Sequence, residues 1–174
     1  MTVVQRFTIF LIISVLLVKF AYGGIQITEV MFDPSCSDSY CEYVEIYNND
    51  SNSINLANWT IGDLSSNDTL EGVLIPSYSY AIITDQDTRI YNYFDINFPL
   101  AWIYVDDDSI GGGLGTSETI SIYDENLNLI DQVSYNNSTS GNSLSLINGT
   151  FQQTTPTPGK SSENEESADY SKLS

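Results

Sequence analysis

The chain of 174 residues contains no histidine and only two cysteines. Without histidine, the Ser-His-Asp and Cys-His arrangements of nucleophilic catalysis are impossible. Two cysteines also fall short of the four ligands that a structural zinc site usually needs. There is no Gly-x-Gly-x-x-Gly or Walker motif, because the glycine-rich residues 111–115 lack the Lys-Ser/Thr pair and no helical pattern follows them. We interpret residues 111–115 as a flexible loop before a strand, and we expect no enzyme activity.

Long hydrophobic runs are also absent, apart from one at the N-terminus. This run, residues 7–18, follows Arg6 and is closed by Lys19, and small residues stand at Ala21 and Gly23. It is shorter than the roughly 20 apolar residues that cross a bilayer. The pattern is typical of a secretory signal peptide over residues 1–23, with cleavage after Gly23. We therefore predict a secreted or cell-surface protein, the alternative being an uncleaved N-terminal membrane anchor.

Basic residues are scarce: the chain has 5 lysines and arginines against 23 aspartates and glutamates, a net charge of −18. Two basic residues and no acidic residue lie in residues 1–23, so removal of that segment changes the charge to −20 (3 − 23). Such a charge repels nucleic acid phosphates and anionic membranes and favours basic partners or divalent cations. We expect no nucleic-acid partner, and membrane contact only through an uncleaved N-terminal segment. A surface adapted to salt is the plainer interpretation of the charge.

Cys36 and Cys41 are predicted to form a disulfide, because an exported chain meets an oxidising environment. The same environment makes Asn-x-Ser/Thr sequons candidate glycosylation sites, and six occur in this Asn-, Ser- and Thr-rich chain. Two of the six, Asn136 and Asn137, are adjacent and compete for one glycan. The candidate sites are Asn49, Asn58, Asn67, Asn136 (or Asn137) and Asn148.

Short runs of alternating apolar and polar residues, separated by turn clusters, predict β-strands throughout the chain. The predicted strands are residues 25–31, 43–47, 59–61, 70–75, 78–84, 103–105, 119–123, 129–135 and 143–146. No segment has a helical apolar face, so an all-β fold, an antiparallel sandwich or barrel, is expected. Trp59 and Trp102 are predicted to pack in or near its core. Residues 154–159 form a proline-containing exit, and residues 160–174 an acidic disordered tail.

The order of these segments resembles the lamin tail domain in its exported prokaryotic form. The matching pieces are residues 27–34, 42–48, 54–61, 74–83, 115–123, 129–135, 143–146 and 156–159. The resemblance implies an immunoglobulin-like antiparallel β-sandwich over residues 24–159, acting as a binding or adaptor module without catalytic residues. Glu29, Glu45 and Asn48 match polar positions of the family, and we interpret them as strand-end and turn residues that satisfy backbone groups. The DNA association of nuclear lamin tails is not transferred, because this chain is strongly acidic.

Clustered aspartates make calcium the candidate cofactor, although none is required. Asp106, Asp107 and Asp108 follow a predicted strand, and Asp85 and Asp87 form a second pair. Calcium prefers carboxylate and carbonyl oxygens from loops, but neither group has EF-hand spacing. The alternative is that these loops are simply solvated.

Two functional hypotheses come from different classes. The first is an interaction module that binds a protein or a glycan at the cell surface through loops or a strand edge. A group of aromatic residues could supply the contact surface or, alternatively, cap the core: Tyr91, Tyr93, Phe94, Phe98 and Trp102. The second hypothesis is a small hydrolase that uses a pair of carboxylates. A third hypothesis is a structural spacer without a specific ligand.

Overall fold

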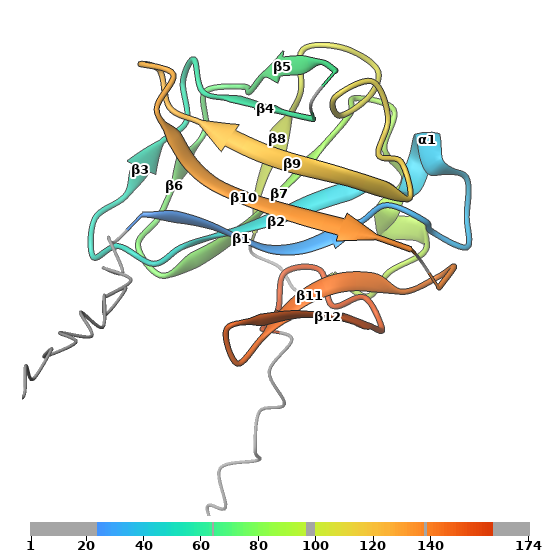
Figure 1. Cartoon of the computed structure of the whole chain (residues 1–174). Coiled ribbons are helices and arrows are strands. Elements are labelled where there is room, and N and C mark those ends of the chain that lie inside the picture. The colour runs from blue at the N-terminus through green and yellow to red at the C-terminus, as the bar shows by residue number, and fades with distance from the viewer. Residues whose placement is uncertain (1–23, 64, 97–99, 138, 162–174) are drawn as a thin grey trace, which may run out of the picture.

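The alternating strands pack as two antiparallel sheets in a β-sandwich, as the computed structural model shows (Figure 1). The model describes residues 24–63, 65–96, 100–137 and 139–161. The predicted signal peptide, residues 1–23, and residues 162–174 of the predicted tail lie outside the described residues. No helix in the described part of the chain has the length and apolar character of a membrane span.

The larger sheet has six strands, in the order β12-β11-β1-β2-β7-β8, and the smaller sheet has four, in the order β10-β9-β4-β5. The strands β3 and β6 form a separate two-stranded sheet. The larger sheet comprises β1 (Ile25–Met31), β2 (Tyr43–Asn48), β7 (Ser79–Thr84), β8 (Ala101–Tyr104), β11 (Ser143–Ile147) and β12 (Thr150–Thr154). The other strands are β3 (Ile54–Asn55), β4 (Thr60–Gly62), β5 (Asn67–Thr69), β6 (Leu74–Ile75), β9 (Ser117–Tyr123) and β10 (Leu129–Asn136). Two short helical turns, α1 (Asp38–Cys41) and the 3-10 helix η1 (Ile90–Asn92), complete the fold.

The main core lies between the two sheets and consists of the inward-facing residues of each strand. Ile27 and Ile46 of the larger sheet and Ile61 and Ile122 of the smaller sheet are all fully buried there. Trp59 is 7% exposed and joins this core, which confirms its predicted packing role. Each buried isoleucine contributes roughly 1.5–3 kcal/mol through the hydrophobic effect.

A second, smaller core covers the outer face of the larger sheet. Met31, Tyr43, Ile82 and Ile90 are fully buried there, with Phe94, Ile96, Leu100 and Trp102 partly buried against them. Both faces of β2 are therefore covered, which explains why five of its six residues are buried. The predicted aromatic group divides: Phe94 and Trp102 cap this second core, Tyr91 and Tyr93 are exposed, and Phe98 lies outside the described residues.

One strand pair departs from the expected antiparallel arrangement, because β7 and β8 run parallel. Parallel neighbours need a crossover of a dozen residues or more. The chain between β7 and β8, which includes η1, supplies it, and Ile90, Phe94, Ile96 and Leu100 of this connection pack in the second core.

One predicted strand is not continuous in the structure, and one strand of the structure was not predicted. Residues 70–75 are not one strand, since Leu70 forms a bridge to Val105 and only Leu74 and Ile75 form β6. The polar strand β12 was not predicted. It follows a two-residue turn in which Asn148 and Gly149 have φ angles of 50° and 75°, and Asn-Gly is the preferred sequence for such a turn.

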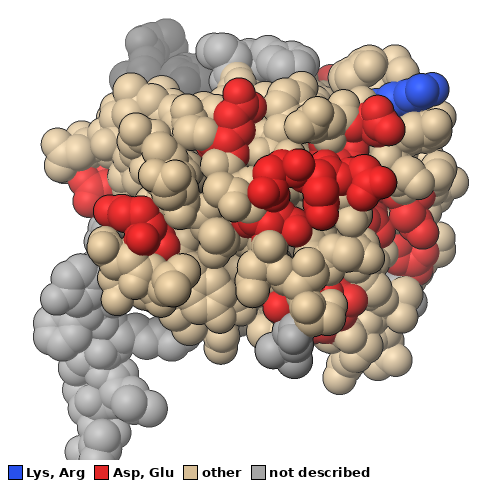
Figure 2. All heavy atoms as spheres, turned by 90° about the horizontal axis from the view of Figure 1, so that it is seen from above, with Lys and Arg blue, Asp and Glu red and all other residues tan. Residues whose placement is uncertain are grey.

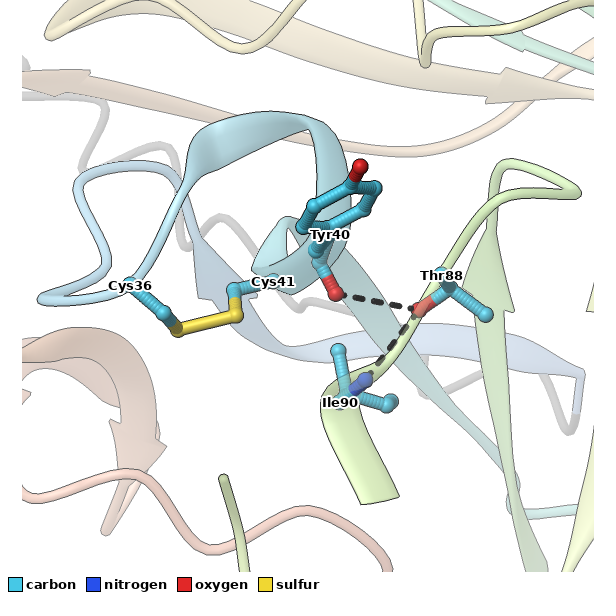
Figure 3. Close-up of a disulfide and its surroundings, with 5 residues drawn as sticks. All are labelled: Cys36, Tyr40, Cys41, Thr88 and Ile90. Atoms are coloured by element: carbon cyan, nitrogen blue, oxygen red, sulfur yellow. Dashed lines mark hydrogen bonds between the residues drawn. A yellow bond between two sulfur atoms is a disulfide. The ribbon is translucent and has the colours of Figure 1, made fainter. Parts of the chain in front are cut away.

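Cys36 and Cys41 form a disulfide, with a sulfur–sulfur distance of 2.08 Å (Figure 3). It closes the loop that contains α1, and α1 in turn holds the start of the crossover. The Tyr40 carbonyl accepts hydrogen bonds from the Arg89 amide at 2.8 Å and from the Thr88 hydroxyl at 3.4 Å. The Arg89 guanidinium lies 4.2 Å from the centre of the Tyr40 ring. The disulfide therefore anchors a turn that positions η1 and the second core.

Candidate binding face

The three aspartates predicted as a calcium site lie directly after β8 and are all exposed. The carboxylate of Asp106 accepts a hydrogen bond from the Thr69 amide at 2.8 Å. The carboxylate of Asp107 accepts one from the Ser109 amide at 3.0 Å. Two of the three side chains thus bond to backbone amides of the surrounding loops.

The fold brings further acidic residues to the same end of the sandwich. Asp63 and Asp68 belong to the β4–β5 hairpin and Asp85 follows β7, and their charges interact with those of the loop after β8. We call this group the acidic face; its residues are Asp63, Asp68, Asp85, Asp106, Asp107 and Asp108. Figure 2 shows acidic side chains gathered on the side of the molecule seen from above, with blue atoms of a basic side chain at the margin of the view.

Burial and mutual repulsion raise the pKa values of two members of the acidic face. For Asp68, burial is the largest cause, and the charges of Asp107, Asp106 and Asp63 add to it. For Asp85, burial again leads, with contributions from Asp87 and Asp108. Burial therefore dominates both shifts, and the neighbouring carboxylates add to it because like charges disfavour the ionised form.

A second group of ionisable residues lies beside the acidic face. Burial, together with Asp38, Asp85 and Glu118, raises the pKa of Glu42 to about 7. Tyr135 and Glu118 are cross-strand partners, and burial and the Glu118 charge raise the pKa of Tyr135 well above its ordinary value. The Glu42 carboxylate accepts the Leu114 amide at 3.1 Å, which ties the glycine-rich loop to the sheet.

The glycine-rich loop precedes β9, as predicted, and contacts two residues of the acidic face. The Gly111 amide donates to the Asp68 carboxylate. Gly111 has a φ angle of +60°, and a Cβ atom there would lie 3.0 Å from the Asp63 nitrogen. Only glycine combines this backbone conformation with so close an approach.

The calcium prediction for Asp106, Asp107 and Asp108 stays a prediction. Within residues 24–63, 65–96, 100–137 and 139–161, no three His, Cys, Asp or Glu side chains are grouped in a way that could hold a metal ion. The carboxylates of the acidic face point to separate backbone amides, as the bonds of Asp106, Asp107 and Asp68 show.

A groove of about 580 Å³ borders the acidic face where β5 and β8 meet. Its lining includes Tyr104, which is 36% exposed, together with Glu71, Gln86 and Asp106. The Glu71 amide donates to the Tyr104 carbonyl at 2.9 Å and holds the two walls together. An aromatic ring beside two carboxylates suits a cationic side chain, which is attracted to both.

Glu29 and Glu45 are fully buried cross-strand partners on β1 and β2. Glu29 accepts the Tyr43 hydroxyl at 2.7 Å and the Thr157 amide at 3.0 Å. Glu45 accepts the Thr28 hydroxyl at 2.7 Å and the Gly159 amide at 2.6 Å. The pair thereby fastens residues 156–160, here called the C-terminal strap, across the sheet.

Asn48 has a comparable role at the end of β2. Its side-chain amide donates to the carbonyls of Asn52, Ile75 and Pro76 at 2.9, 3.2 and 2.9 Å, and its carbonyl accepts the Asp50 amide at 3.0 Å. The prediction that Glu29, Glu45 and Asn48 satisfy backbone groups is confirmed, but only Asn48 lies at a strand end, since Glu29 and Glu45 are inside β1 and β2. What the sequence did not indicate is that the two glutamates bond to the C-terminal strap.

Most of the candidate glycosylation sites lie on the surface. Asn58, Asn67, Asn136 and Asn148 are exposed, whereas Asn49 is half-buried, with its side-chain oxygen accepting the Gly24 amide at 2.6 Å. Their use stays a prediction.

Sequence reasoning found Asp106, Asp107, Asp108 and Asp85 but missed Asp63, Asp68, Glu42 and Glu118. These four residues come from separate strands and turns, and no local spacing connects them. Asp68 is the residue of these four that could have been noticed, because a charged residue in the middle of a three-residue strand is buried only when it has a partner.

Comparison with known proteins agrees with this architecture. The model of the lamin tail domain family matches residues 19–137. No curated protein and no solved structure gives a significant match. The match ends before β11, although β11 and β12 complete the larger sheet. Because the matched region spans more than half of the chain and the fold is an immunoglobulin-like β-sandwich, the chain belongs to the lamin tail domain family.

Proposed function

We propose that the chain is a non-catalytic interaction domain that binds a basic protein surface through its acidic face. The observation that carries the proposal is the concentration of six carboxylates at one end of the sandwich, whose charges add to burial in raising the pKa values of Asp68 and Asp85. A face of one sign speeds the encounter with a partner of opposite sign and rejects partners of the same sign. The neighbouring groove offers Tyr104, Glu71 and Asp106 to a lysine or arginine side chain.

The basic residues of the chain itself do little to neutralise the acidic face. Arg89 and Lys160 are the two basic residues of the described part of the chain. Arg89 stacks on Tyr40, and the Lys160 ammonium pairs with Asp95 at 2.7 Å. The charge of the acidic face is therefore available to a partner.

A binding role agrees with the family, whose members are immunoglobulin-like domains that are generally non-catalytic. The hydrolase hypothesis has less support. Glu29 and Glu45, the glutamates that the fold pairs across two strands, are fully buried beneath the C-terminal strap, and their oxygens accept hydrogen bonds.

The variant D107N/D108N is expected to weaken binding to a basic test protein, such as a lysine-rich histone used purely as a polycation, by roughly tenfold at low salt. The matched variant D50N/D95N also removes two charges, one half-buried and one exposed, but outside the acidic face, and should retain most of the affinity. Titration calorimetry at two salt concentrations measures both effects. Equal losses in the two variants would show that net charge, not this face, drives binding; no binding by the wild type would refute the proposal.

We further propose that the domain is secreted or displayed at the cell surface. The composition of residues 1–23 and the Cys36–Cys41 disulfide support this location. The native protein is expected to begin at Gly24. Its intact mass should be lower than that of the reduced protein by the mass of the two thiol hydrogens. Mass spectrometry of medium and surface fractions measures it. A full-length, reduced protein in the cytoplasm would refute export.

A further inference from the structure

A second pocket, of about 330 Å³, lies on the outer face of the larger sheet and shares no lining residue with the acidic face. Its floor is formed by a row of three side chains on neighbouring strands. Gln26 of β1 pairs with Tyr47 of β2, and Tyr47 pairs with Tyr80 of β7. The tip of the β11–β12 hairpin, at Gly149, and Ser161 beyond the C-terminal strap also line it.

The two tyrosines form a half-buried aromatic platform. Their ring centres are 4.7 Å apart and the ring planes are tilted by 42°. They are fixed in place by the register of β2 and β7, so the platform forms with the sheet and does not depend on a mobile loop. Pre-formed concave sites with aromatic walls and a few polar groups are the usual form of a small-molecule site.

Polar groups surround this platform on the side of β1. The Thr28 hydroxyl is oriented by its 2.7 Å hydrogen bond to Glu45. Glu45 is itself fully buried, and the Gly159 amide fixes its other oxygen. The Gln26 side-chain amide contributes both a donor and an acceptor. Beside Gly149 there is open space, with no atom within 4 Å of an added Cβ, so the pocket can be entered there.

The charge of the lining selects the class of ligand. None of the residues that line the pocket is basic, and one, Glu45, is acidic. An anionic ligand would find no partner there and would be repelled by the charge of the whole chain. A flat apolar ligand would offer no partner to the Gln26 side-chain amide.

We propose that this pocket binds a neutral sugar unit of a glycan. A sugar ring presents an apolar C–H face, which packs on Tyr47 and Tyr80, and an edge of hydroxyl groups, which need both donors and acceptors. Gln26 and Thr28 supply these at the rim of the platform. The volume lies at the lower end of the range for ligand pockets, roughly 300–1,000 Å³, as suits a short saccharide. This inference is independent of the basic partner of the acidic face.

The test is binding of the intact, disulfide-bonded protein to an array of neutral oligosaccharides, with sialylated and sulfated oligosaccharides on the same array. We expect retention of neutral members only. For a retained oligosaccharide, Tyr80→Ala and Gln26→Ala should each weaken binding by roughly tenfold in calorimetry. The matched control Tyr91→Ala removes an exposed tyrosine from the η1 turn and should change nothing.

Circular dichroism and thermal melting must show that each variant is folded. The D107N/D108N variant should bind the oligosaccharide as the wild type does, which separates this site from the acidic face. The proposal is overturned if the folded wild type retains no neutral oligosaccharide, if anionic oligosaccharides bind better, or if Tyr80→Ala and Tyr91→Ala bind equally well.

Discussion

Glu29→Ala is expected to lower the free energy of unfolding by roughly 3–5 kcal/mol. The substitution removes the acceptor for the Tyr43 hydroxyl and for the Thr157 amide and hydroxyl, all joined to the Glu29 carboxylate at 2.7–3.2 Å. The buried Tyr43 hydroxyl loses its partner, and a cavity forms beneath the C-terminal strap. Each buried polar group left without a partner costs about 1–3 kcal/mol.

Urea unfolding followed by tryptophan fluorescence measures this loss. Glu29→Gln retains one oxygen acceptor and should recover part of the stability. Glu71→Ala, at an exposed carboxylate, serves as the control and should change the free energy by no more than about 0.5 kcal/mol. If Glu29→Ala is no more destabilising than Glu71→Ala, the bonds to the C-terminal strap do not contribute to stability. Hydrogen exchange at the Thr157 amide reports on the strap directly.

Raising the pH from about 6 to about 9 is expected to lower the free energy of unfolding by a few kcal/mol, which is the effect expected from two carboxyl groups with raised pKa values. Burial, and then the Glu29 charge, raises the pKa of Glu45 to about 8, and burial raises that of Glu42 to about 7. A carboxyl whose folded pKa exceeds its unfolded value of 4.5 stabilises the fold fully below 4.5. That contribution is lost as the pH rises through the folded pKa.

The unfolding midpoint in urea, measured across this pH range, should therefore fall on the alkaline side. Glu45→Gln cannot ionise and should flatten the profile, and Glu42→Gln/Glu45→Gln should flatten it further. A wild-type midpoint that is constant between about pH 6 and 9 would contradict the assignment of these two groups. At the acidic end, the carboxyls of Asp50 and Asp124, whose pKa values are lowered by hydrogen bonds to nearby amides, lose their contribution as the pH falls below about 4.

The sequence predicts those parts of the fold in which side-chain alternation coincides with burial. In β9, Ile120 and Ile122 alternate with polar residues and face the main core. In β1 and β10 a register shift interrupts the alternation, but these strands also lie where the pattern placed them. Asn48 was also predictable, because a buried asparagine at a strand end commonly satisfies a turn. Periodicity works here because one side of each strand packs against the opposite sheet.

Other features depend on contacts that no local pattern contains. The strand β12, Thr-Phe-Gln-Gln-Thr, is polar because it lies at a sheet edge, and β5 has the sequence Asn-Asp-Thr. The parallel pairing of β7 and β8 depends on the connection between the two strands, which contains η1. The acidic face combines residues from the β4–β5 hairpin and from the ends of β7 and β8. Individual acidic loops could be seen in the sequence, but their proximity could not.

The position of β1 within the larger sheet has a consequence for how the chain folds. This strand is the first to be synthesised, yet it lies between β2 and β11, and Glu29 bonds to Thr157, 128 positions later. Loop closure over such a separation has an entropic cost before any contact compensates for it, so formation of the complete sheet is slow compared with that of a fold built from local contacts. A growing chain therefore holds β1 with one free edge until the β11–β12 hairpin arrives. The domain can reach its native state only after nearly all of its length is available.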